Sequence, residues 1–310
     1  MSRILVTGGA GYIGSILMPM LLDNNHEVIV LDNFVYSQTS LLDCCHNPNL
    51  RIVRNDVRNT DLVESLVRQS EVIIHLACIV GAPACDKDPV AAKTINYDSI
   101  FNILRTRSDQ LLIYPNTNSG YGIGQKGINC TEETPLKPIS LYGKLKVMAE
   151  EEILSRSNTV SLRLATVFGV SPRMRLDLLV NDFVYRAVND KFLILFEPHF
   201  KRNFIHVRDV ARAFIHTIDH CDSMTGQAYN VGLSNANLSK WELCEEIKKQ
   251  IPNFYFSGAE IGEDSDKRNY IVNNEKIEKT GFKPAVSLQE GITELIKGYQ
   301  IIKRSQYTNI

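Results

Sequence analysis

A glycine-rich segment near the N-terminus constrains the fold of this chain more than any other feature of its sequence. The segment Thr7-Gly8-Gly9-Ala10-Gly11-Tyr12-Ile13-Gly14 directly follows a short apolar run, Arg3–Thr7. Its glycines satisfy the spacing G-x-G-x-x-G and also G-x-x-G-x-x-G. Apolar residues then recur at helical spacing between Tyr12 and Asn24. This order of strand, glycine turn and helix predicts a turn that binds the pyrophosphate of a dinucleotide.

The residues around this turn predict which dinucleotide binds. The N-terminus of a helix directs unpaired amides and partial positive charge at phosphates. Asp32 follows the second apolar strand, Glu27–Leu31, where an acid hydrogen-bonds a ribose 2′-hydroxyl. Asp32 would repel a 2′-phosphate, and no arginine or lysine follows it closely, so the sequence favours NAD over NADP. The expected cofactor contacts here are Gly8, Gly11, Tyr12, Ile13, Gly14, Asp32 and Asn33.

Asp56 follows the third expected strand, Arg51–Val53, and two interpretations of it stay open. In the first, Asp56 accepts a hydrogen bond from the adenine amine, with Val57 beside it as a further cofactor contact. In the second, Asp56 caps the N-terminus of the next helix in Asp56-Val57-Arg58.

Strands and helices alternate through the first half of the chain. This alternation predicts an α/β fold with a Rossmann-type, doubly wound parallel sheet covered by helices on both faces. After Val167-Phe168-Gly169 the regular alternation of strands and helices ends. This change indicates a smaller C-terminal α/β cap that binds the substrate. The expected domains are residues 1–168 with about 204–232, and residues 169–203 with 233–310. The further expected strands are 71–76, 110–114, 160–164, 192–196, 203–207 and 228–231, and the expected helices are 59–69, 90–107, 141–157, 178–188, 210–218, 238–250 and 288–303.

A tyrosine and a lysine on one of these helices predict acid–base chemistry. Tyr142 and Lys146 are four residues apart, so they share a helix face. Tyrosine is a poor base at its ordinary pKa of about 10. A lysine ammonium and a positively charged nicotinamide both favour the phenolate, so Tyr142 can take a hydroxyl proton while hydride leaves the same carbon. Lys146 is also expected to hold the nicotinamide ribose, and Thr117, at a strand end, to orient the substrate hydroxyl.

Composition excludes several other classes of protein. The net charge of −1 gives no field that would steer the molecule to nucleic acid. The seven cysteines contain no Cys-x-x-Cys pair, which favours free thiols of a reducing cytosol over disulfides or a zinc site. No G-x-S-x-G or H-E-x-x-H motif indicates a hydrolase. No apolar run suits a signal peptide or a membrane span, so we expect a cytoplasmic protein without metal, nucleic-acid or membrane partners.

Set side by side, these motifs resemble the extended short-chain dehydrogenase/reductase family, which contains the NAD-dependent nucleotide-sugar epimerases and dehydratases. The resemblance implies that Thr117, Tyr142 and Lys146 are catalytic and that the cofactor is NAD. It places Leu76, Ala77, Asn96, Tyr142 and Lys146 among the residues that bind the cofactor. It implies substrate-binding roles for Asn118, Ser119, Arg175, Asn181, Arg202 and Arg268, with Arg202 and Arg268 on the nucleotide diphosphate, which the planar arginine fork binds well. The motifs that carry it are Gly8-x-x-Gly11-x-x-Gly14, Asp32, His75-Leu76-Ala77, Thr117 before Tyr121-Gly122, Tyr142-x-x-x-Lys146, 202–210 and 281–284.

The resemblance implies a first step, oxidation of the sugar at C4. The family's dehydratases carry Asp-Glu after the catalytic threonine, whereas this chain has Asn118 and Ser119, so 4,6-dehydration is not expected. Residues 115–122 and 165–175 resemble the GDP-D-glycero-α-D-manno-heptose 4-dehydrogenases of capsular polysaccharide synthesis, which makes that GDP-sugar the expected substrate. One alternative is a 4-epimerase with a 4-keto intermediate. The other is a non-catalytic NAD sensor, and this second alternative is disfavoured because Tyr142 and Lys146 are both present.

Family members pair helices equivalent to 90–107 and 141–157, so a homodimer is expected, with a tetramer as the alternative.

Overall fold

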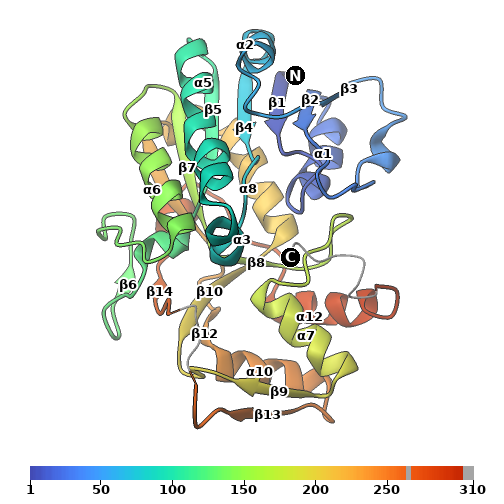
Figure 1. The fold of residues 1–310 in the computed structure, drawn as a ribbon, viewed down its shortest axis with the longest axis vertical. Coiled ribbons are helices and arrows are strands. Elements are labelled where there is room, and N and C mark those ends of the chain that lie inside the picture. The colour runs from blue at the N-terminus through green and yellow to red at the C-terminus, as the bar shows by residue number, and fades with distance from the viewer. Residues whose placement is uncertain (263–266, 303–310) are drawn as a thin grey trace.

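The computed structural model describes residues 1–262 and 267–302, and its centre is a seven-stranded sheet (Figure 1). The strand order is β11-β7-β5-β4-β1-β2-β3, and every neighbouring pair is parallel. The chain runs outward from β1 to β3 and then in the opposite direction from β4, which creates a switch point beside β1. The expected doubly wound parallel sheet is thereby confirmed. Its strands are β1 (Arg3–Thr7), β2 (Glu27–Asp32), β3 (Leu50–Arg54), β4 (Val72–His75), β5 (Leu111–Thr117), β7 (Thr159–Leu164) and β11 (Gln227–Val231).

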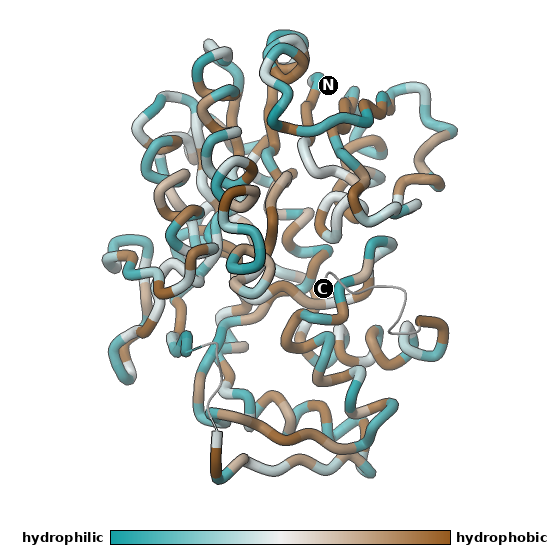
Figure 2. The backbone as a smooth tube through the Cα atoms, viewed as in Figure 1, coloured by the Kyte–Doolittle hydropathy of each residue, from teal (hydrophilic) through white to brown (hydrophobic). Residues whose placement is uncertain are grey.

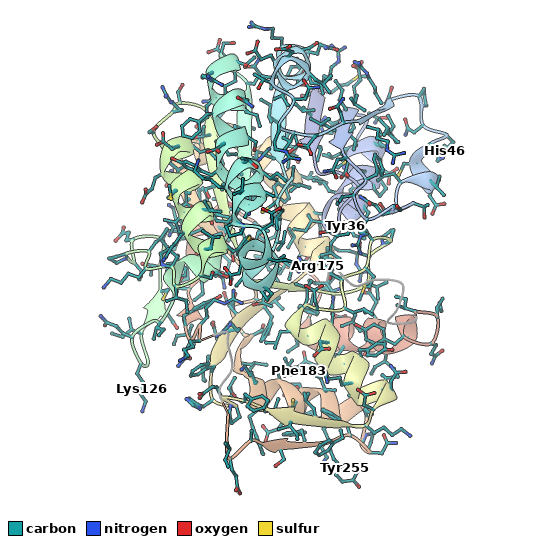
Figure 3. All side chains as sticks on the ribbon, viewed as in Figure 1. Tyr36, His46, Lys126, Arg175, Phe183 and Tyr255 are labelled. Carbon is teal, nitrogen blue, oxygen red and sulfur yellow. The ribbon has the colours of Figure 1, made fainter. Side chains whose placement is uncertain are left out.

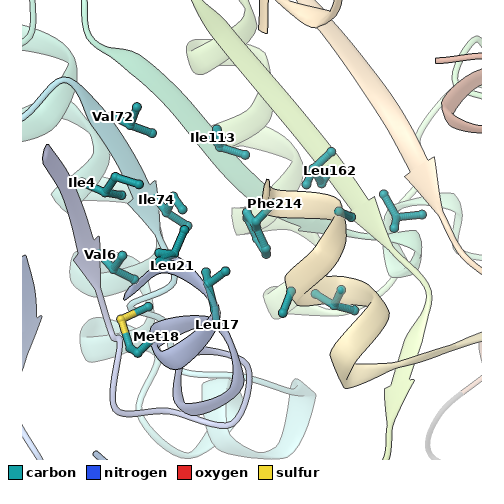
Figure 4. Packing of buried hydrophobic residues seen from close by; sticks show 14 of the residues in the cluster. Ile4, Val6, Leu17, Met18, Leu21, Val72, Ile74, Ile113, Leu162 and Phe214 are labelled. Carbon is teal, nitrogen blue, oxygen red and sulfur yellow. The ribbon is translucent and has the colours of Figure 1, made fainter. Parts of the chain in front are cut away.

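Helices cover both faces of this sheet because its strands are apolar on both sides. In β1, Ile4 and Val6 join one core cluster and Leu5 joins the other, as the period of two in a strand requires. On the first face Leu17 of α1 (Gly14–Asp23) and Phe214 of α8 (Val207–Asp219) pack against the strands (Figure 4). The opposite face is covered by α2 (Thr60–Arg68), α5 (Ser99–Thr106) and α6 (Leu141–Leu154).

The C-terminal part of the chain forms a second lobe with its own apolar core. This lobe lies below the sheet in Figure 1, and Figure 2 shows hydrophobic residues along β9. Its core includes Phe168, Phe204 and Phe254, all of which are fully buried. Its strands are β8 (Thr166–Phe168), β9 (Phe192–Leu195), β10 (Lys201–His206), β12 (Asn237–Ser239) and β13 (Tyr255–Gly258), and its helices are α7 (Leu179–Asn189), α10 (Lys240–Gln250) and α12 (Leu288–Gly298).

The single helix expected over residues 90–107 is interrupted. A short helix, α4 (Pro89–Lys93), is followed by a π-helical turn, η2 (Thr94–Asp98), and then by α5. A further helix that the sequence did not predict, α3 (Ala82–Lys87), precedes them. Prolines at the starts of α3 and α4 fit the first helical turn, where no amide partner is lost. The π-helical turn contains Asn96, and such turns often occur at functional sites.

The remaining differences concern element ends and very short elements. α6 ends at Leu154 and not at Ser157, and α12 ends at Gly298, while the expected end at Lys303 lies outside the described residues. Among the described residues, no helix has both the length and the apolar character that crossing a membrane requires. The short elements are η1 (Leu42–Cys44), η3 (Asn118–Tyr121), β6 (Asn129–Cys130), α9 (Cys221–Met224), β14 (Ile271–Val272) and α11 (Glu275–Glu278).

Candidate active site

The glycine-rich turn between β1 and α1 leaves no room for side chains at two positions. A Cβ atom at Gly8 would lie 2.6 Å from the backbone N of Ala77, and one at Gly14 would lie 2.3 Å from the carbonyl O of Gly9. A Cβ at Gly11 would meet only the carbonyl O of Gly8, at 3.2 Å, so Gly11 borders open space. Because α1 begins at Gly14, the positive end of its helix dipole lies at this space. The shape and polarity of this cradle fit a pyrophosphate.

Asp32, at the end of β2, turns its carboxylate back toward the glycine turn. Oδ2 accepts a hydrogen bond from the amide of Ala10 at 3.0 Å, and Oδ1 accepts one from the amide of Phe34 at 2.8 Å. Burial raises the pKa of Asp32, and these two backbone hydrogen bonds oppose the rise. The carboxylate therefore lies where the fold allows it to contact a ribose next to the turn.

Asp56 does not cap α2, so one of its two interpretations is wrong. The cap is Asn59, whose side chain accepts a hydrogen bond from the amide of Leu62. Asp56 instead bonds the guanidinium of Arg58 at 2.8 and 2.9 Å, and these bonds lower the pKa of Asp56 to about 2. The side-chain amide of Asn33 also donates to Asp56, at 3.3 Å, which keeps Asp56 near the end of β2. The adenine contact stays a prediction, and the side chain of Val57 belongs to the core between the sheet and α2.

The segment after β4 is held against the glycine turn. The amides of Leu76 and Ala77 donate to Thr7, to its carbonyl O at 2.9 Å and to its Oγ1 at 3.3 Å. Asn96 then clamps Ile79, because its Oδ1 accepts from the amide at 2.7 Å and its Nδ2 donates to the carbonyl at 2.8 Å. Asn96 therefore fixes the backbone of the loop that follows Leu76 and Ala77.

Tyr142 and Lys146 lie on the face of α6 that covers the end of β5. Lys146 is 4% exposed, and its Nζ lies 3.8 Å from the ring centroid of Tyr114 in β5. The backbone next to Tyr142 is close to η3, since a Cβ at Gly143 would lie 3.6 Å from the carbonyl O of Ser119. Burial lowers the pKa of Lys146 to about 8, so the ammonium form still predominates at neutral pH.

Burial raises the pKa of the Tyr142 phenol above its ordinary value. The neighbouring thiol of Cys78 adds to this rise, while the guanidinium groups of Arg175 and Arg268 oppose it. A buried phenol needs nearby positive charge to ionise, and Arg175 and Arg268 supply such charge from two loops. The lowering expected from Lys146 together with a bound nicotinamide stays a prediction.

The end of β5 brings Thr117 and Ser119 together with Arg268. The hydroxyl of Thr117 donates to Oγ of Ser119 at 2.9 Å and accepts from the amide of Ser119 at 3.1 Å. The guanidinium of Arg268 also donates to Oγ of Ser119. Asn118, between them, is fully buried, and within the described residues its amide N and O have no hydrogen-bond partner. Arg268 was predicted to bind a diphosphate, and the structure places it at this strand end beside Tyr142.

Arg175 lies between the sheet and the second lobe, where Figure 3 labels it near Tyr36. Its guanidinium pairs with the carboxylate of Asp177 and faces Tyr142. Arg202, on β10, is 3% exposed and stacks over the ring of Tyr270 at 5.5 Å. Tyr270 is two residues from Arg268, so both predicted phosphate-binding arginines belong to one region of the second lobe.

Asn181 was expected to contact the substrate, and the structure places it in the protein interior. It is fully buried, and its Oδ1 accepts from the amide of Gly169 at 3.0 Å. Its Nδ2 donates to the hydroxyl of Tyr12 at 3.2 Å and to the carbonyl of Arg175 at 2.8 Å. The hydroxyl of Tyr12 in turn donates to the carbonyl of Gly169 at 2.7 Å. Both polar atoms of this side chain are hydrogen-bonded within the protein, so Asn181 joins the two lobes, and its contact with a substrate stays a prediction.

Two residues of the site were missed in the sequence. Cys78, directly after His75-Leu76-Ala77, is close enough to Tyr142 and Lys146 to influence both of their pKa values. Tyr114 lies under Lys146, and within the described part of the chain its hydroxyl has no hydrogen-bond partner. Cys78 could have been predicted from its position directly after the His75-Leu76-Ala77 motif. Tyr114 lies within a buried strand, and nothing in its sequence neighbourhood distinguishes it from a core residue.

Comparison with known proteins agrees with this fold. A model of the NAD dependent epimerase/dehydratase family matches residues 4–232. A putative UDP-glucose 4-epimerase from Methanocaldococcus jannaschii is 28% identical over 308 residues, which cover 94% of this chain and 97% of the relative.

Two solved structures are similar over almost the whole chain. A UDP-glucose 4-epimerase from Thermotoga maritima with UDP-glucose has a TM-score of 0.84 at 23% identity, covering 96% of this chain and 98% of that one. A dTDP-glucose 4,6-dehydratase from Bacillus anthracis in complex with NAD has a TM-score of 0.82 at 24% identity, covering 99% of each chain. At these identities the two structures show a shared fold.

Proposed function

The chain belongs to the NAD-dependent epimerase/dehydratase family, and from this premise we propose that it oxidises the C4 hydroxyl of a nucleotide-activated sugar to a ketone. The observation that carries the proposal is the position of Tyr142 and Lys146. Both lie on one face of α6, above the end of β5, and the segment after β4 joins this place to the glycine turn. A hydroxyl bound there would meet a general base and the reactive end of the cofactor together.

Each catalytic side chain has its own part in this oxidation. Thr117 orients the sugar hydroxyl, and Tyr142 takes its proton. The chemistry that bound NAD supplies is the acceptance of a hydride from the same carbon. Lys146 holds the ribose, and its positive charge on the same helix face favours the phenolate. The guanidinium groups of Arg175 and Arg268 also favour the phenolate, against the burial that raises the pKa of the phenol.

The loops of the second lobe suit an anionic substrate. Arg202 and Arg268 are assigned to the nucleotide diphosphate, because a guanidinium binds two phosphate oxygens at once. Arg175 is already paired with Asp177, which compensates part of its charge. Asn118 offers a buried amide donor and acceptor, and a sugar hydroxyl would satisfy atoms that otherwise carry a desolvation penalty.

The residues after Thr117 argue against loss of water from the sugar. Elimination across C5 and C6 needs an acid beside the ring. The two positions are filled by Asn118 and Ser119, and neither side chain titrates near neutral pH. The reaction therefore keeps all carbon–oxygen bonds of the sugar.

The expected sugar is D-glycero-α-D-manno-heptose, carried on GDP. What supports it is the resemblance of residues 115–122 and 165–175 to the 4-dehydrogenases of that substrate, two segments that border Tyr142 in the structure. Because one fold serves many sugars, the experiment below compares this substrate with two other nucleotide sugars.

A second candidate is 4-epimerisation, in which the ketone is reduced again from its other face. The observation in its favour is the named activity of the archaeal relative, a putative UDP-glucose 4-epimerase. Both candidates use Thr117, Tyr142 and Lys146 in the same first step. They differ in whether the ketone leaves the site.

One experiment separates the two candidates. The purified protein is incubated with NAD and, in separate reactions, GDP-D-glycero-α-D-manno-heptose, GDP-mannose and UDP-glucose, and each nucleotide sugar is then analysed by mass spectrometry. A product lighter by two hydrogens, with NADH formed in step, supports the dehydrogenase and names its substrate. A product of unchanged mass but altered chromatographic retention supports the epimerase. No change with any of the three sugars contradicts the assigned substrates.

A further inference from the structure

A buried carboxylate lies directly behind the candidate active site. Glu150 is on α6, one helical turn after Lys146, and is 2% exposed. Its Oε1 accepts hydrogen bonds from Nη2 and Nε of Arg163, at 2.7 and 3.0 Å. Its Oε2 accepts from Nδ2 of Asn116 at 2.6 Å and from Oγ of Ser161 at 2.5 Å. These donors come from β5 and β7, so Glu150 ties the catalytic helix to two central strands.

Stability alone does not account for the Glu150–Arg163 pair. Removing two charges from water is expensive, and a buried ion pair is often no more stabilising than apolar side chains of the same volume. Here the desolvation is offset by many hydrogen bonds, since Nη1 of Arg163 also donates to the hydroxyl of Tyr121 at 3.1 Å and to the carbonyl of Glu132 at 2.9 Å. A network this well satisfied specifies one arrangement of the groups around it.

Asn116 connects Glu150 to the catalytic end of β5. Its Nδ2 donates to Glu150, and its Oδ1 accepts the backbone amide of Thr117 at 2.8 Å. The carboxylate accepts hydrogen bonds only, so it requires the NH₂ of Asn116 on its side and leaves the carbonyl facing Thr117. Glu150 therefore decides which way the Asn116 amide points and, through it, holds the backbone that carries the Thr117 hydroxyl.

Glu150 also affects the charge of Lys146. The titratable groups that face Lys146 are His75 of β4, Cys78 after β4, Cys85 of α3, Tyr114 of β5, and Tyr142 and Glu150 of α6. Burial lowers the pKa of Lys146, and Cys78 and Glu150 act against burial. Among these side-chain types, only glutamate is ordinarily anionic at neutral pH. Glu150 is thus the group whose charge stabilises the ammonium in its native surroundings.

We propose that Glu150 is a positioning residue for the catalytic centre, which fixes Thr117 through Asn116 and keeps Lys146 in its ammonium form. The inference rests on the proposed function, in which Thr117 and Lys146 act on the sugar hydroxyl and the cofactor ribose. Glu150 is buried between α6 and strands β5 and β7, where its oxygens are occupied by Asn116, Ser161 and Arg163, so it is not expected to contact either ligand. Its loss is expected to lower kcat, shift the pH dependence and leave KM nearly unchanged.

The test compares Glu150→Gln with Glu151→Gln, which neutralises the adjacent, exposed glutamate of the same helix. The pKa of Lys146 is measured by NMR from the pH dependence of its Cε signal in protein with ¹³C-labelled lysine, and the signal is assigned through Lys146→Arg. The native midpoint is expected at about 8. Glu150→Gln is expected to lower it by about one unit, because an adjacent opposite charge is removed. Glu151→Gln is expected to leave it in place.

The same variants are assayed by NADH formation, using whichever of the three nucleotide sugars the native protein oxidises. Glu150→Gln is expected to lose about tenfold in kcat, with KM changed less than about twofold. The alkaline limb of its pH profile should move to lower pH with the pKa of Lys146. Equal midpoints and equal kcat in Glu150→Gln and the native protein would overturn the inference.

A buried Arg163 without its partner can prevent folding, so a double variant, Glu150→Gln with Arg163→Gln, is measured in parallel. It contains no unpaired buried charge at this place. The lower midpoint of Lys146 is still expected, because Glu150 acts on the pKa of Lys146 and Arg163 is not among the groups that do. A native midpoint in the double variant would also overturn the inference. The NMR titration needs no substrate, so it distinguishes failure of this inference from failure of the proposed function, which would appear as native protein that turns over none of the three sugars.

Discussion

Tyr142 is surrounded by cations from several segments because a buried phenol does not ionise unaided. Burial raises its pKa, and Arg175 and Arg268 oppose that rise from loops of the second lobe. Lys146 lies on the same helix face. The surroundings of the proposed general base are therefore set by tertiary structure, and the spacing of Tyr142 and Lys146 describes only a part of them.

Tyr142→Phe tests this assignment. The variant keeps the ring and its packing but removes the hydroxyl that takes the proton, so kcat is expected to fall by at least about 100-fold. NAD binding, measured by isothermal titration calorimetry, is expected to stay within about twofold of native, because the phenol is not assigned to the cofactor phosphates. Tyr255→Phe is the matched control, since Tyr255 is 63% exposed on β13, far from the site (Figure 3). Native turnover in Tyr142→Phe would exclude this tyrosine as the base.

Asn181→Ala tests the interior role of Asn181. The change removes three hydrogen bonds and leaves the amide of Gly169 and the carbonyl of Arg175 buried without a partner. We expect a loss of about 2 to 3 kcal/mol of stability, measured by urea unfolding. Asn189→Ala, on the exposed end of the same helix, is expected to change stability by less than about 0.5 kcal/mol. A stable Asn181→Ala protein with a raised KM would instead support the substrate contact that the sequence predicted.

The elements that could be predicted from the sequence are those whose own residues determine them. Strands β1, β2 and β4 are buried on both faces, so almost all of their residues are apolar and each strand can be recognised in the sequence as a continuous apolar run between turn residues. Helices such as α8 carry an apolar stripe of the right period. In contrast, β6 and β14 have two residues each, too few for any period. Their pairing depends on where the chain returns after many other residues have folded.

The residues of the candidate site also fall into two groups: those that a local sequence pattern predicts and those whose surroundings depend on tertiary structure. The glycine turn, Asp32 and the Tyr142–Lys146 pair are local patterns, and the structure gathers them at one edge of the sheet. The environment of Asn181 could not be predicted, because Tyr12 and Gly169 approach it from distant parts of the chain. The ion pair of Arg175 with Asp177 could not be predicted either, because Arg175 lies in a loop and no helical or strand periodicity fixes where its side chain points.

Gly14→Ala tests the geometry of the turn at the start of α1. Alanine favours a helix by about 1 kcal/mol over glycine, so propensity alone predicts a harmless change. The added Cβ would nevertheless lie 2.3 Å from the carbonyl O of Gly9, and backbone cannot yield there as a flexible side chain does. We expect the Kd for NAD to rise at least about tenfold, because the turn must open to relieve the contact.

Gly258→Ala is the control for this variant. A Cβ at Gly258 would lie 3.7 Å from Cγ of Pro198, an ordinary contact on β13. Its affinity for NAD is expected to equal that of the native protein in the same calorimetric titration. Tight NAD binding by Gly14→Ala would show that the close approach of Gly9 and Gly14 is not required for the cofactor.

At the scale of the whole molecule, the glycine turn and the helix after it are joined to the second lobe. The hydroxyl of Ser15, on α1, pairs with that of Ser171 at 2.8 Å, next to the bond between Tyr12 and Gly169. On α8, the carboxylate of Asp209 accepts hydrogen bonds from the backbone amides of Ala285 and Val286, at 2.9 and 3.0 Å. These two residues lie just before α12. The sheet and the second lobe therefore share polar contacts at two places, and a ligand that orders the glycine turn acts on both.

This arrangement predicts that NAD stabilises the molecule as one unit. A ligand at about 100 times its Kd adds about 2.7 kcal/mol to the free energy of unfolding, which for a chain of this length raises Tm by about 5 °C. Differential scanning calorimetry is expected to show one transition that moves entirely to higher temperature with NAD. NADP at the same concentration is expected to move it much less, because its 2′-phosphate meets the carboxylate of Asp32. A second transition that keeps its temperature in the presence of NAD would show that the two lobes unfold independently, and the contacts of Tyr12 and Ser15 would then be too weak to couple them.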